Sequence, residues 1–181
     1  ASDIILDCQG YTVSGNGSLY NTGVLSQSGY TNATVKNCVF SNFGAGITFY
    51  LGGYNTVENT SSHSNYIGIT LYQSTYNNLT DFSSWNNTGA PSYGIGIYMY
   101  QSNYDTFKNG YVYNNDNHAF YILSSYYGDY NGITSTGNRY GIAFDDAYVS
   151  GSNNFTNINA SSNTADGMYL ICYSYCNVNN A

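Results

Sequence analysis

The chain has 181 residues and a formal net charge of −7 at pH 7, with three basic residues against ten acidic ones. So few cations cannot neutralise a phosphate backbone, which excludes nucleic acid as a partner. The length fits one domain, and no apolar run reaches the roughly 18 residues of a membrane-spanning helix, so we expect no membrane insertion.

The first expected element is a strand from Asp3 to Cys8. Aligning Ile5-Leu6-Asp7-Cys8 with Val35-Lys36-Asn37-Cys38 places Cys8 beside Cys38, which predicts a disulfide between them. Cys172 and Cys176 share inward parity near the C-terminus, where a local bridge and two buried free thiols remain as alternatives.

A glycine followed by an apolar-x-apolar triplet recurs along the chain at steps of 22 or 23 residues, with two longer steps. The copies begin at Gly46, Gly68, Gly96, Ala119, Gly141 and Gly167, after a partial copy at Gly23. In the copy at Gly68, Ile69 and Leu71 are expected to point inward and Thr70 outward, as in a strand. A period of this length predicts the stacked coils of a solenoid.

A second series of apolar residues in polar surroundings follows the same period: Val35, Val57, Leu79, Phe107, Ile133, Phe155 and Val178. Amide or acidic residues stand two places later, and because stacked coils lie about 4.8 Å apart we expect them to bond from coil to coil. The predicted ladder comprises Asn37, Asn59, Asp81, Asn109 and Asn157. Tyrosines three places before this series are expected at corners: Tyr54, Tyr76, Tyr104, Tyr130 and Tyr175.

The segment GITLYQSTYNNLTDFSSWN resembles the repeat of right-handed parallel β-helix proteins of the NosD-like and related carbohydrate-binding or sugar-hydrolase class. The opening IILDCQGYTVSG is similar to the first coil of secreted archaeal and bacterial members. The resemblance implies an all-β, right-handed parallel β-helix, a single-stranded solenoid of about seven coils. It specifies function poorly, since this fold hosts lyases, hydrolases, adhesins, tail spikes and surface-layer components.

Candidate chemistry is sparse. Asp129, Asp145 and Asp146 fall in or beside insertions expected at one corner, with Arg139 as a cationic partner, and together they offer a weak catalytic alternative or a Ca²⁺ site. A solvated acidic loop is the competing interpretation. Lys36 and Glu58, on neighbouring coils, are expected to form a surface ion pair. Without convergent His and Cys ligands, we expect no zinc or copper centre and no cofactor.

Export is favoured by the even number of cysteines and by seven Asn-x-Ser/Thr acceptors. These glycosylation candidates are Asn16, Asn32, Asn59, Asn78, Asn86, Asn154 and Asn159. Chance alone also generates such triplets in a chain this rich in Asn, Ser and Thr. We expect an extracellular or cell-surface location.

Neither end of the chain shows a helical or polar cap. We therefore expect one domain over 1–181, open at both ends: a fragment of a longer β-helix, or a subunit that stacks end to end. The favoured function is a secreted structural protein of a filament, sheath or surface layer, without enzymatic activity. A polysaccharide-binding or polysaccharide-cleaving module and an adhesin are the alternatives, with glycans as further partners.

Overall fold

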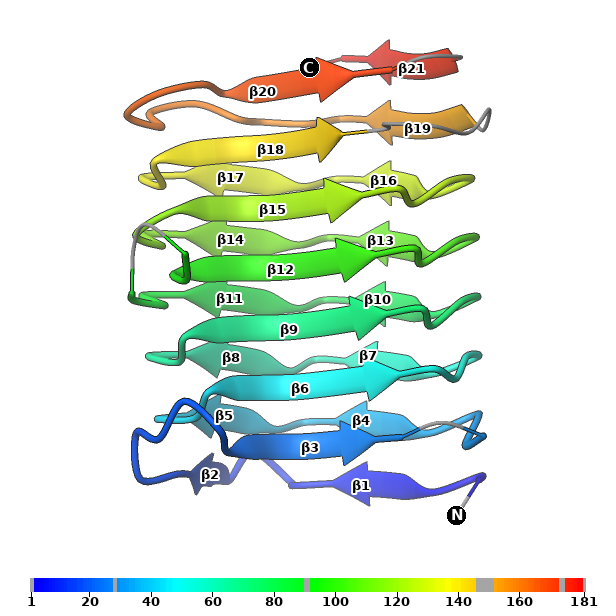
Figure 1. Cartoon of the computed structure of the whole chain (residues 1–181), viewed down its shortest axis with the longest axis vertical. Helices are drawn as coiled ribbons and strands as arrows, with labels where there is room; N and C mark the ends of the chain where they lie inside the picture. Colours follow the sequence, from blue (N-terminus) through cyan, green and yellow to red (C-terminus); the bar gives the residue numbers. More distant parts are fainter. Residues whose placement is uncertain (1, 28, 90–91, 146–151, 173–174, 181) are drawn as a thin grey trace.

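The computed structural model describes residues 2–27, 29–89, 92–145, 152–172 and 175–180, and within them every regular element is a β-strand. The strands form coils stacked along one axis, with the N-terminus at one end of the rod and the C-terminus at the other (Figure 1). The expectation of an all-β parallel solenoid of about seven coils is confirmed. The described part of the chain holds no helix with the length and apolarity needed to cross a membrane.

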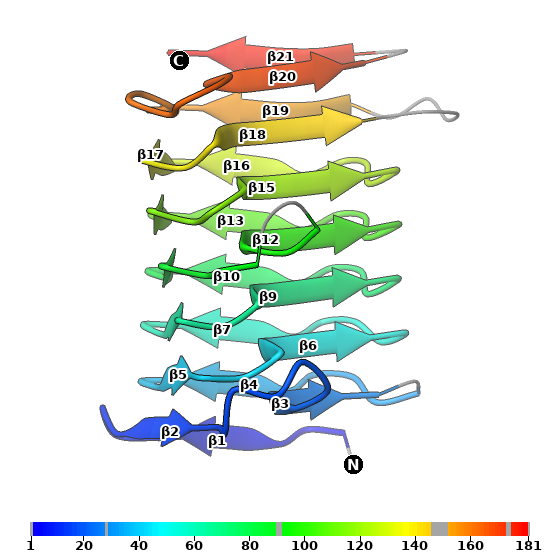
Figure 2. The ribbon, with the colours of Figure 1, turned by 60° about the vertical axis from the view of Figure 1, so that its left-hand side comes forward.

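Three parallel sheets form the sides of the rod (Figure 2). Sheet A orders β1(Ile5–Asp7), β4(Thr34–Lys36), β7(Thr56–Glu58), β10(Asn78–Thr80), β13(Thr106–Lys108), β16(Asp129–Asn131), β19(Ser152–Thr156) and β21(Tyr175–Asn179). Sheet B runs through β2(Thr12–Ser14), β5(Val39–Ser41), β8(Ser61–His63), β11(Ser83–Trp85), β14(Tyr111–Tyr113) and β17(Thr134–Thr136). Sheet C holds β3(Thr22–Ser26), β6(Ala45–Tyr50), β9(Ile67–Tyr72), β12(Ile95–Tyr100), β15(His118–Leu123), β18(Tyr140–Asp145) and β20(Met168–Ile171).

Sheet C contains the glycine-led triplets, paired in the predicted register. Ile69 pairs with Ile47 and Ile97, and each of these side chains is fully buried. A Cβ added at Gly68 would lie 2.5 Å from the carbonyl oxygen of Gly96 in the next coil, which explains why glycine precedes the triplet.

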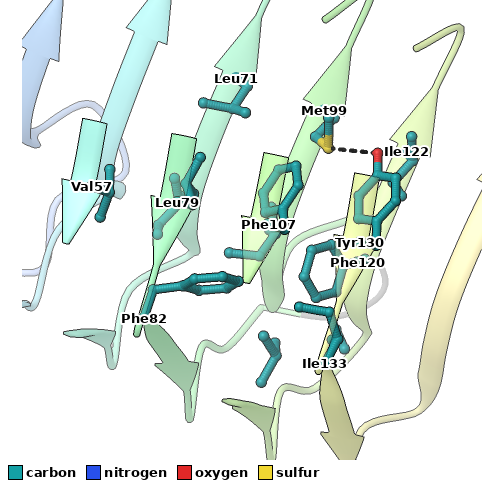
Figure 3. Packing of buried hydrophobic residues seen from close by; sticks show 14 of the residues in the cluster. Val57, Leu71, Leu79, Phe82, Met99, Phe107, Phe120, Ile122, Tyr130 and Ile133 are labelled. Carbon is teal, nitrogen blue, oxygen red and sulfur yellow. Dashed lines mark hydrogen bonds between the residues drawn. The ribbon is translucent and has the colours of Figure 1, made fainter. Parts of the chain in front are cut away.

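The core is a narrow column of aliphatic and aromatic side chains inside the three sheets (Figure 3). In sheet A the series Val57, Leu79 and Phe107 points inward as predicted. The next member is Tyr130, and the prediction of Ile133 is wrong. Tyr130 stacks on Phe107 with 5.0 Å between the ring centroids. The prediction failed because Tyr130 was grouped with the corner tyrosines, which left Ile133 as the next apolar residue of the series.

The corners use left-handed backbone, which asparagine tolerates better than most residues. Asn37, Asn59 and Asn109 have φ of 53°, 45° and 52°. Asn59 Nδ2 donates to Asn37 Oδ1 at 2.9 Å, and Asn109 Nδ2 donates to Asp81 Oδ1 at 3.0 Å. Asn157 Nδ2 donates instead to Asn131 Oδ1 at 3.1 Å, a residue outside the predicted ladder, because Gly132 takes the place between Asn109 and Asn157.

A tyrosine ladder runs along the corner between sheets C and A. The rings of Tyr54, Tyr76, Tyr104 and Tyr127 stack at centroid distances of 5.0, 4.7 and 4.8 Å, close to the coil spacing. Tyr127 takes the place predicted for Tyr130, because Tyr130 lies in the core. The side chain of Tyr175 lies outside the described residues.

The N-terminal coil differs from the predicted alignment by one residue. Ile5 pairs with Thr34, not with Val35. Cys8 and Cys38 are nevertheless joined by a disulfide, with Cα atoms 4.8 Å apart. Among the residues that the structure describes, one ion pair lies within 4.0 Å: Lys36 Nζ to Asp7 Oδ2 at 3.5 Å, so Lys36 pairs with Asp7 and not with Glu58.

Candidate functional site

On the outer face of sheet C, a run of tyrosines in the last four coils is interrupted by one alanine. Backbone register aligns Tyr98 with Tyr121, Tyr121 with Ala143, and Ala143 with Tyr169. Ala143 thus lies in the coil between two tyrosines. Tyr121 and Tyr169 are two coil spacings apart, which is about 10 Å. The strands that carry these residues, β12, β15, β18 and β20, lie one above another in Figure 2.

The missing ring leaves a hollow of about 360 Å³ over Ala143. Its lining combines aromatic, acidic and imidazole groups: His118, Tyr121, Tyr140, Ala143, Asp145, Asp166 and Tyr169. The volume lies within the range of small-ligand sites in proteins. A single small residue in an aromatic column therefore creates a recess of ligand size.

His118 and Tyr140 form one side of the hollow. His118 stacks on Tyr121 at 4.6 Å and on Tyr140 at 4.7 Å, so its ring is held from two directions. The guanidinium carbon of Arg139 lies 5.0 Å from the centroid of the Tyr140 ring. Arg139 thus places a positive charge at the edge of this stack.

Burial lowers the pKa of His118 to about 4, and the positive charge of Arg139 adds to the effect. The imidazole is therefore neutral at pH 7. Its Nδ1 atom is covered and has no hydrogen-bond partner among the described residues. A neutral imidazole can donate a hydrogen bond through one nitrogen and accept through the other.

A second hollow of about 290 Å³ adjoins the first on the same face. It is lined by Ile67, Ser92, Tyr93, Ile95, Tyr98 and Tyr121. Tyr121 belongs to both hollows and separates them along the rod axis. The face of sheet C thus offers an apolar recess beside a polar one, in register with successive coils.

The continuous ladders elsewhere differ from this site because their rings cover one another. Tyr50, Tyr72 and Tyr100 stack at 5.1 and 4.8 Å, and His63, Trp85 and Tyr113 stack at 4.5 and 5.6 Å. In such ladders the ring faces contact the neighbouring rings, so mainly the edges meet solvent. The interrupted column at Ala143 has space beside its rings.

Of the sequence-predicted candidates, Asp145 lines the hollow and Arg139 flanks it through Tyr140. Asp129 lies in sheet A, where its Oδ1 accepts a hydrogen bond from Asn154 Nδ2 at 2.9 Å, and it does not line the hollow. Asp146 lies outside the described residues. Asp145 thus lines the same hollow as His118 and Asp166, which the sequence interpretation did not include.

The described residues contain no group of three or more His, Cys, Asp or Glu side chains that could hold a metal ion. The Ca²⁺ site proposed at Asp129, Asp145 and Asp146 includes a residue beyond that part of the chain and stays a prediction.

Fold and hollow together define a class: a parallel β-helix with a ligand-sized recess on one lateral face. The chain belongs to the right-handed β-helix family, because the model for a right-handed β-helix region matches residues 3–125. No curated protein sequence matches the chain.

Solved structures agree with this fold. The chain superposes on the periplasmic alginate epimerase AlgG, T265N mutant, with a TM-score of 0.71 and 16% identity, covering 87% of this chain and 41% of that chain. The same epimerase without the substitution gives a TM-score of 0.62 at 16% identity, with coverages of 86% and 42%. This chain spans less than half the length of those structures, and at this identity the likeness shows the fold alone.

Proposed function

We propose that this protein is a polysaccharide-binding β-helix module that holds a sugar residue in the hollow over Ala143. The observation that carries the proposal is an alanine that interrupts a run of tyrosines, since Tyr98, Tyr121 and Tyr169 fill the same column in the neighbouring coils. In the three earlier coils the column holds Thr70, Thr48 and Leu25. The space left between coils suits a pyranose ring, which is a little thicker than the tyrosine ring it replaces.

The lining has the groups that sugars require. Tyrosine rings offer apolar surface to the C–H face of a sugar together with a polar hydroxyl. The carboxylates of Asp145 and Asp166 accept hydrogen bonds from sugar hydroxyls, and neutral His118 can donate or accept one. A recess with apolar walls and a few convergent polar groups is the usual form of a small-molecule site.

A polymer is favoured over a single sugar because two hollows lie side by side along the axis, with Tyr121 between them. A chain laid across the coils would place neighbouring residues in neighbouring hollows. The likeness in fold to an epimerase named for alginate is in keeping with a polysaccharide ligand.

The test fills the missing position of the column. Ala143→Tyr should abolish binding to the oligosaccharides that the native protein binds, measured on a glycan array and then by calorimetry. Thr48→Tyr is the matched control, since Thr48 lies in the same column four coils away and its substitution should leave binding unchanged.

Tyr169→Ala gives a second test of sugar binding. It removes a side chain, so its result does not depend on whether the fold can accommodate an added ring. It removes one wall of the hollow and should weaken binding by about tenfold, the loss expected for one stacking contact with some hydrogen bonding. Unchanged binding in both Ala143→Tyr and Tyr169→Ala would overturn the proposal.

Export fits this function, because a protein outside the cytoplasm can meet extracellular polysaccharides. Two disulfides, Cys8–Cys38 and Cys172–Cys176, are typical of oxidising compartments. Six of the seven candidate glycosylation asparagines are exposed and Asn154 is partly exposed. Deglycosylation followed by intact-mass measurement on protein from its natural source tests whether they carry glycans.

Assembly into an extracellular filament, sheath or surface layer is a second candidate. Ile5, Leu6 and Val13, in β1 and β2, are exposed on the first coil, and a coil of another copy stacked there would cover them. Negative-stain microscopy should then show filaments that Leu6→Glu disrupts and Ala143→Tyr does not. Dispersed particles at high protein concentration would contradict assembly.

A further inference from the structure

The charges around the hollow limit which sugar it can take. Two of its lining residues, Asp145 and Asp166, are acidic, and none is basic. Of the chain's three basic residues, Lys36 and Lys108 belong to strands of sheet A, away from this face of the rod. Arg139 alone stands near, with its guanidinium against the outer ring of Tyr140.

His118 adds no positive charge, since burial and Arg139 together keep its imidazole neutral at pH 7. An acidic sugar in the hollow would place its carboxylate among like charges, with one cation at the rim to offset them. A sugar with an ammonium group would instead meet a carboxylate at either end of the hollow and the faces of several tyrosines, which attract cations. The net charge of −7 on the whole chain favours approach of a cationic polymer in the same sense.

We propose that the hollow over Ala143 selects amino sugars, with the ring of a glucosamine-type residue lodged between Tyr121 and Tyr169 and its ammonium group held by Asp145 at one end of the hollow or by Asp166 at the other. This inference rests on the proposed saccharide-binding function and names its ligand class. It separates this protein from a binder of uronates such as alginate.

The experiment compares three tetrasaccharides of equal length by calorimetry at about pH 6, where ordinary carboxylates are ionised. The probes are a glucosamine tetramer, an N-acetylglucosamine tetramer and a galacturonate tetramer. The glucosamine tetramer should bind about tenfold more tightly than the acetylated one at low salt, with the difference shrinking as ionic strength rises. The galacturonate tetramer should bind most weakly of the three.

The double variant Asp145→Asn, Asp166→Asn keeps the size of both side chains and removes their charge. The ratio of its affinities for the glucosamine and acetylated tetramers should fall toward one. A loss of affinity that is equal for both tetramers does not change this ratio. A preference that survives in this variant, or a galacturonate tetramer that binds as tightly as the glucosamine tetramer, would overturn the assignment.

The two proposals fail in different ways. If Ala143→Tyr abolishes binding of an acetylated or acidic tetramer while the native protein shows no preference for the amine, the saccharide site stands and the amino-sugar assignment falls. If no tetramer binds the native protein, or if binding is equal in Ala143→Tyr and Thr48→Tyr, both fall.

Discussion

Asp105 is a buried carboxyl group in a position that asparagine fills in the two preceding coils. Its Oδ1 accepts hydrogen bonds from the backbone N and Nδ2 of Asn77, both at 2.8 Å, and its Oδ2 accepts one from Ser102 Oγ at 2.6 Å. Burial raises the pKa of Asp105 to about 7, although these hydrogen bonds act in the opposite direction. The aspartate therefore makes the stability of the rod depend on pH.

Asp105→Asn should remove that dependence. In the native protein the folded state keeps its proton between about pH 4 and 7 while the unfolded state loses it, so stability falls as pH rises through this window. The variant should match the native protein near pH 4 and exceed it above pH 7 by up to about 4 kcal/mol. Urea unfolding at pH 4 and pH 8 measures both differences, and equal differences at the two pH values would refute the account.

Tyr130 is a fully buried phenol in a column of apolar side chains. Its hydroxyl lies 3.5 Å from Met99 Sδ, a weak acceptor (Figure 3). Its ring stacks between Phe107 and Phe155. Tyr130→Phe should change the free energy of unfolding by less than about 1 kcal/mol, with stabilisation expected, since a poorly bonded buried hydroxyl is removed. Tyr130→Ala should cost about 3–5 kcal/mol by leaving a cavity. Chemical denaturation of the two variants separates the contribution of the hydroxyl group to stability from that of the ring.

At the scale of elements, a buried asparagine ladder joins the corner between sheets B and C across five coils. Its rungs are Asn65, Asn87, Asn115, Asn138 and Asn163. Each rung after Asn65 accepts a hydrogen bond at Oδ1 from the backbone N of the rung before it. The Nδ2 atoms of Asn87, Asn115 and Asn138 also donate to the Oδ1 of the next rung. The ladder satisfies corner amides that the sheets leave unpaired and fixes the spacing of the coils that frame the hollow.

Asn115→Ala should destabilise the protein by about 2–4 kcal/mol, because the backbone N of Asn87 loses its acceptor inside the corner and Asn87 Nδ2 keeps only its hydrogen bond to Ser84 Oγ. Asn109→Gly is the matched control in the exposed ladder. Glycine occupies the equivalent place in the next coil at Gly132 and tolerates the left-handed backbone, so the cost should stay near or below about 1 kcal/mol. Equal losses in the two variants, measured by thermal unfolding, would contradict this distinction.

The sequence predicts the strands of sheet C but not those of sheet B, and the difference lies in their inward-facing residues. Periodicity found the strands of sheet C because their inward residues, such as Ile69 and Leu71, are apolar. It missed sheet B as a separate side because the inward residues of β8 and β11 are Ser62 and Ser84, which bond the carbonyl oxygens of Gly68 and Gly96. No hydrophobic pattern marks such a strand.

The site was partly within reach of the sequence. The same alignment that revealed the triplets sets Ala143 against Tyr98, Tyr121 and Tyr169, so the break in the column was visible in the letters. What the alignment alone did not show was that His118 and Asp166, three residues before Tyr121 and Tyr169, line the same hollow as Ala143. Acidic residues alone drew attention to Asp129, which faces another side of the rod.

At the scale of the whole molecule, the solenoid is nearly one-dimensional, since each coil contacts only its neighbours. The Cys8–Cys38 disulfide joins the first two coils across 30 residues, whereas Cys172–Cys176 closes a separation of only 4. Loss of the longer link frees more of the unfolded chain and so matters more.

Cys8→Ser with Cys38→Ser should therefore raise amide exchange in residues before about Ser26 while the central coils keep their protection. The local cost should be about 2–4 kcal/mol. Cys172→Ser with Cys176→Ser is the control, with a smaller effect limited to the last coil. Hydrogen exchange followed by mass spectrometry gives the result, and uniform loss of protection along the rod would show one cooperative unit instead.

Trp85 is the single tryptophan of the chain, in β11 near the middle of the rod, with its indole stacked between His63 at 4.5 Å and Tyr113 at 5.6 Å. The ladder thus gives the protein a built-in optical reporter, whose fluorescence depends on the two rings that enclose it. Emission from this one indole follows the central coils alone, while the many tyrosines report on the full length. Comparing the two signals during unfolding would show whether the rod melts inward from its ends or all at once.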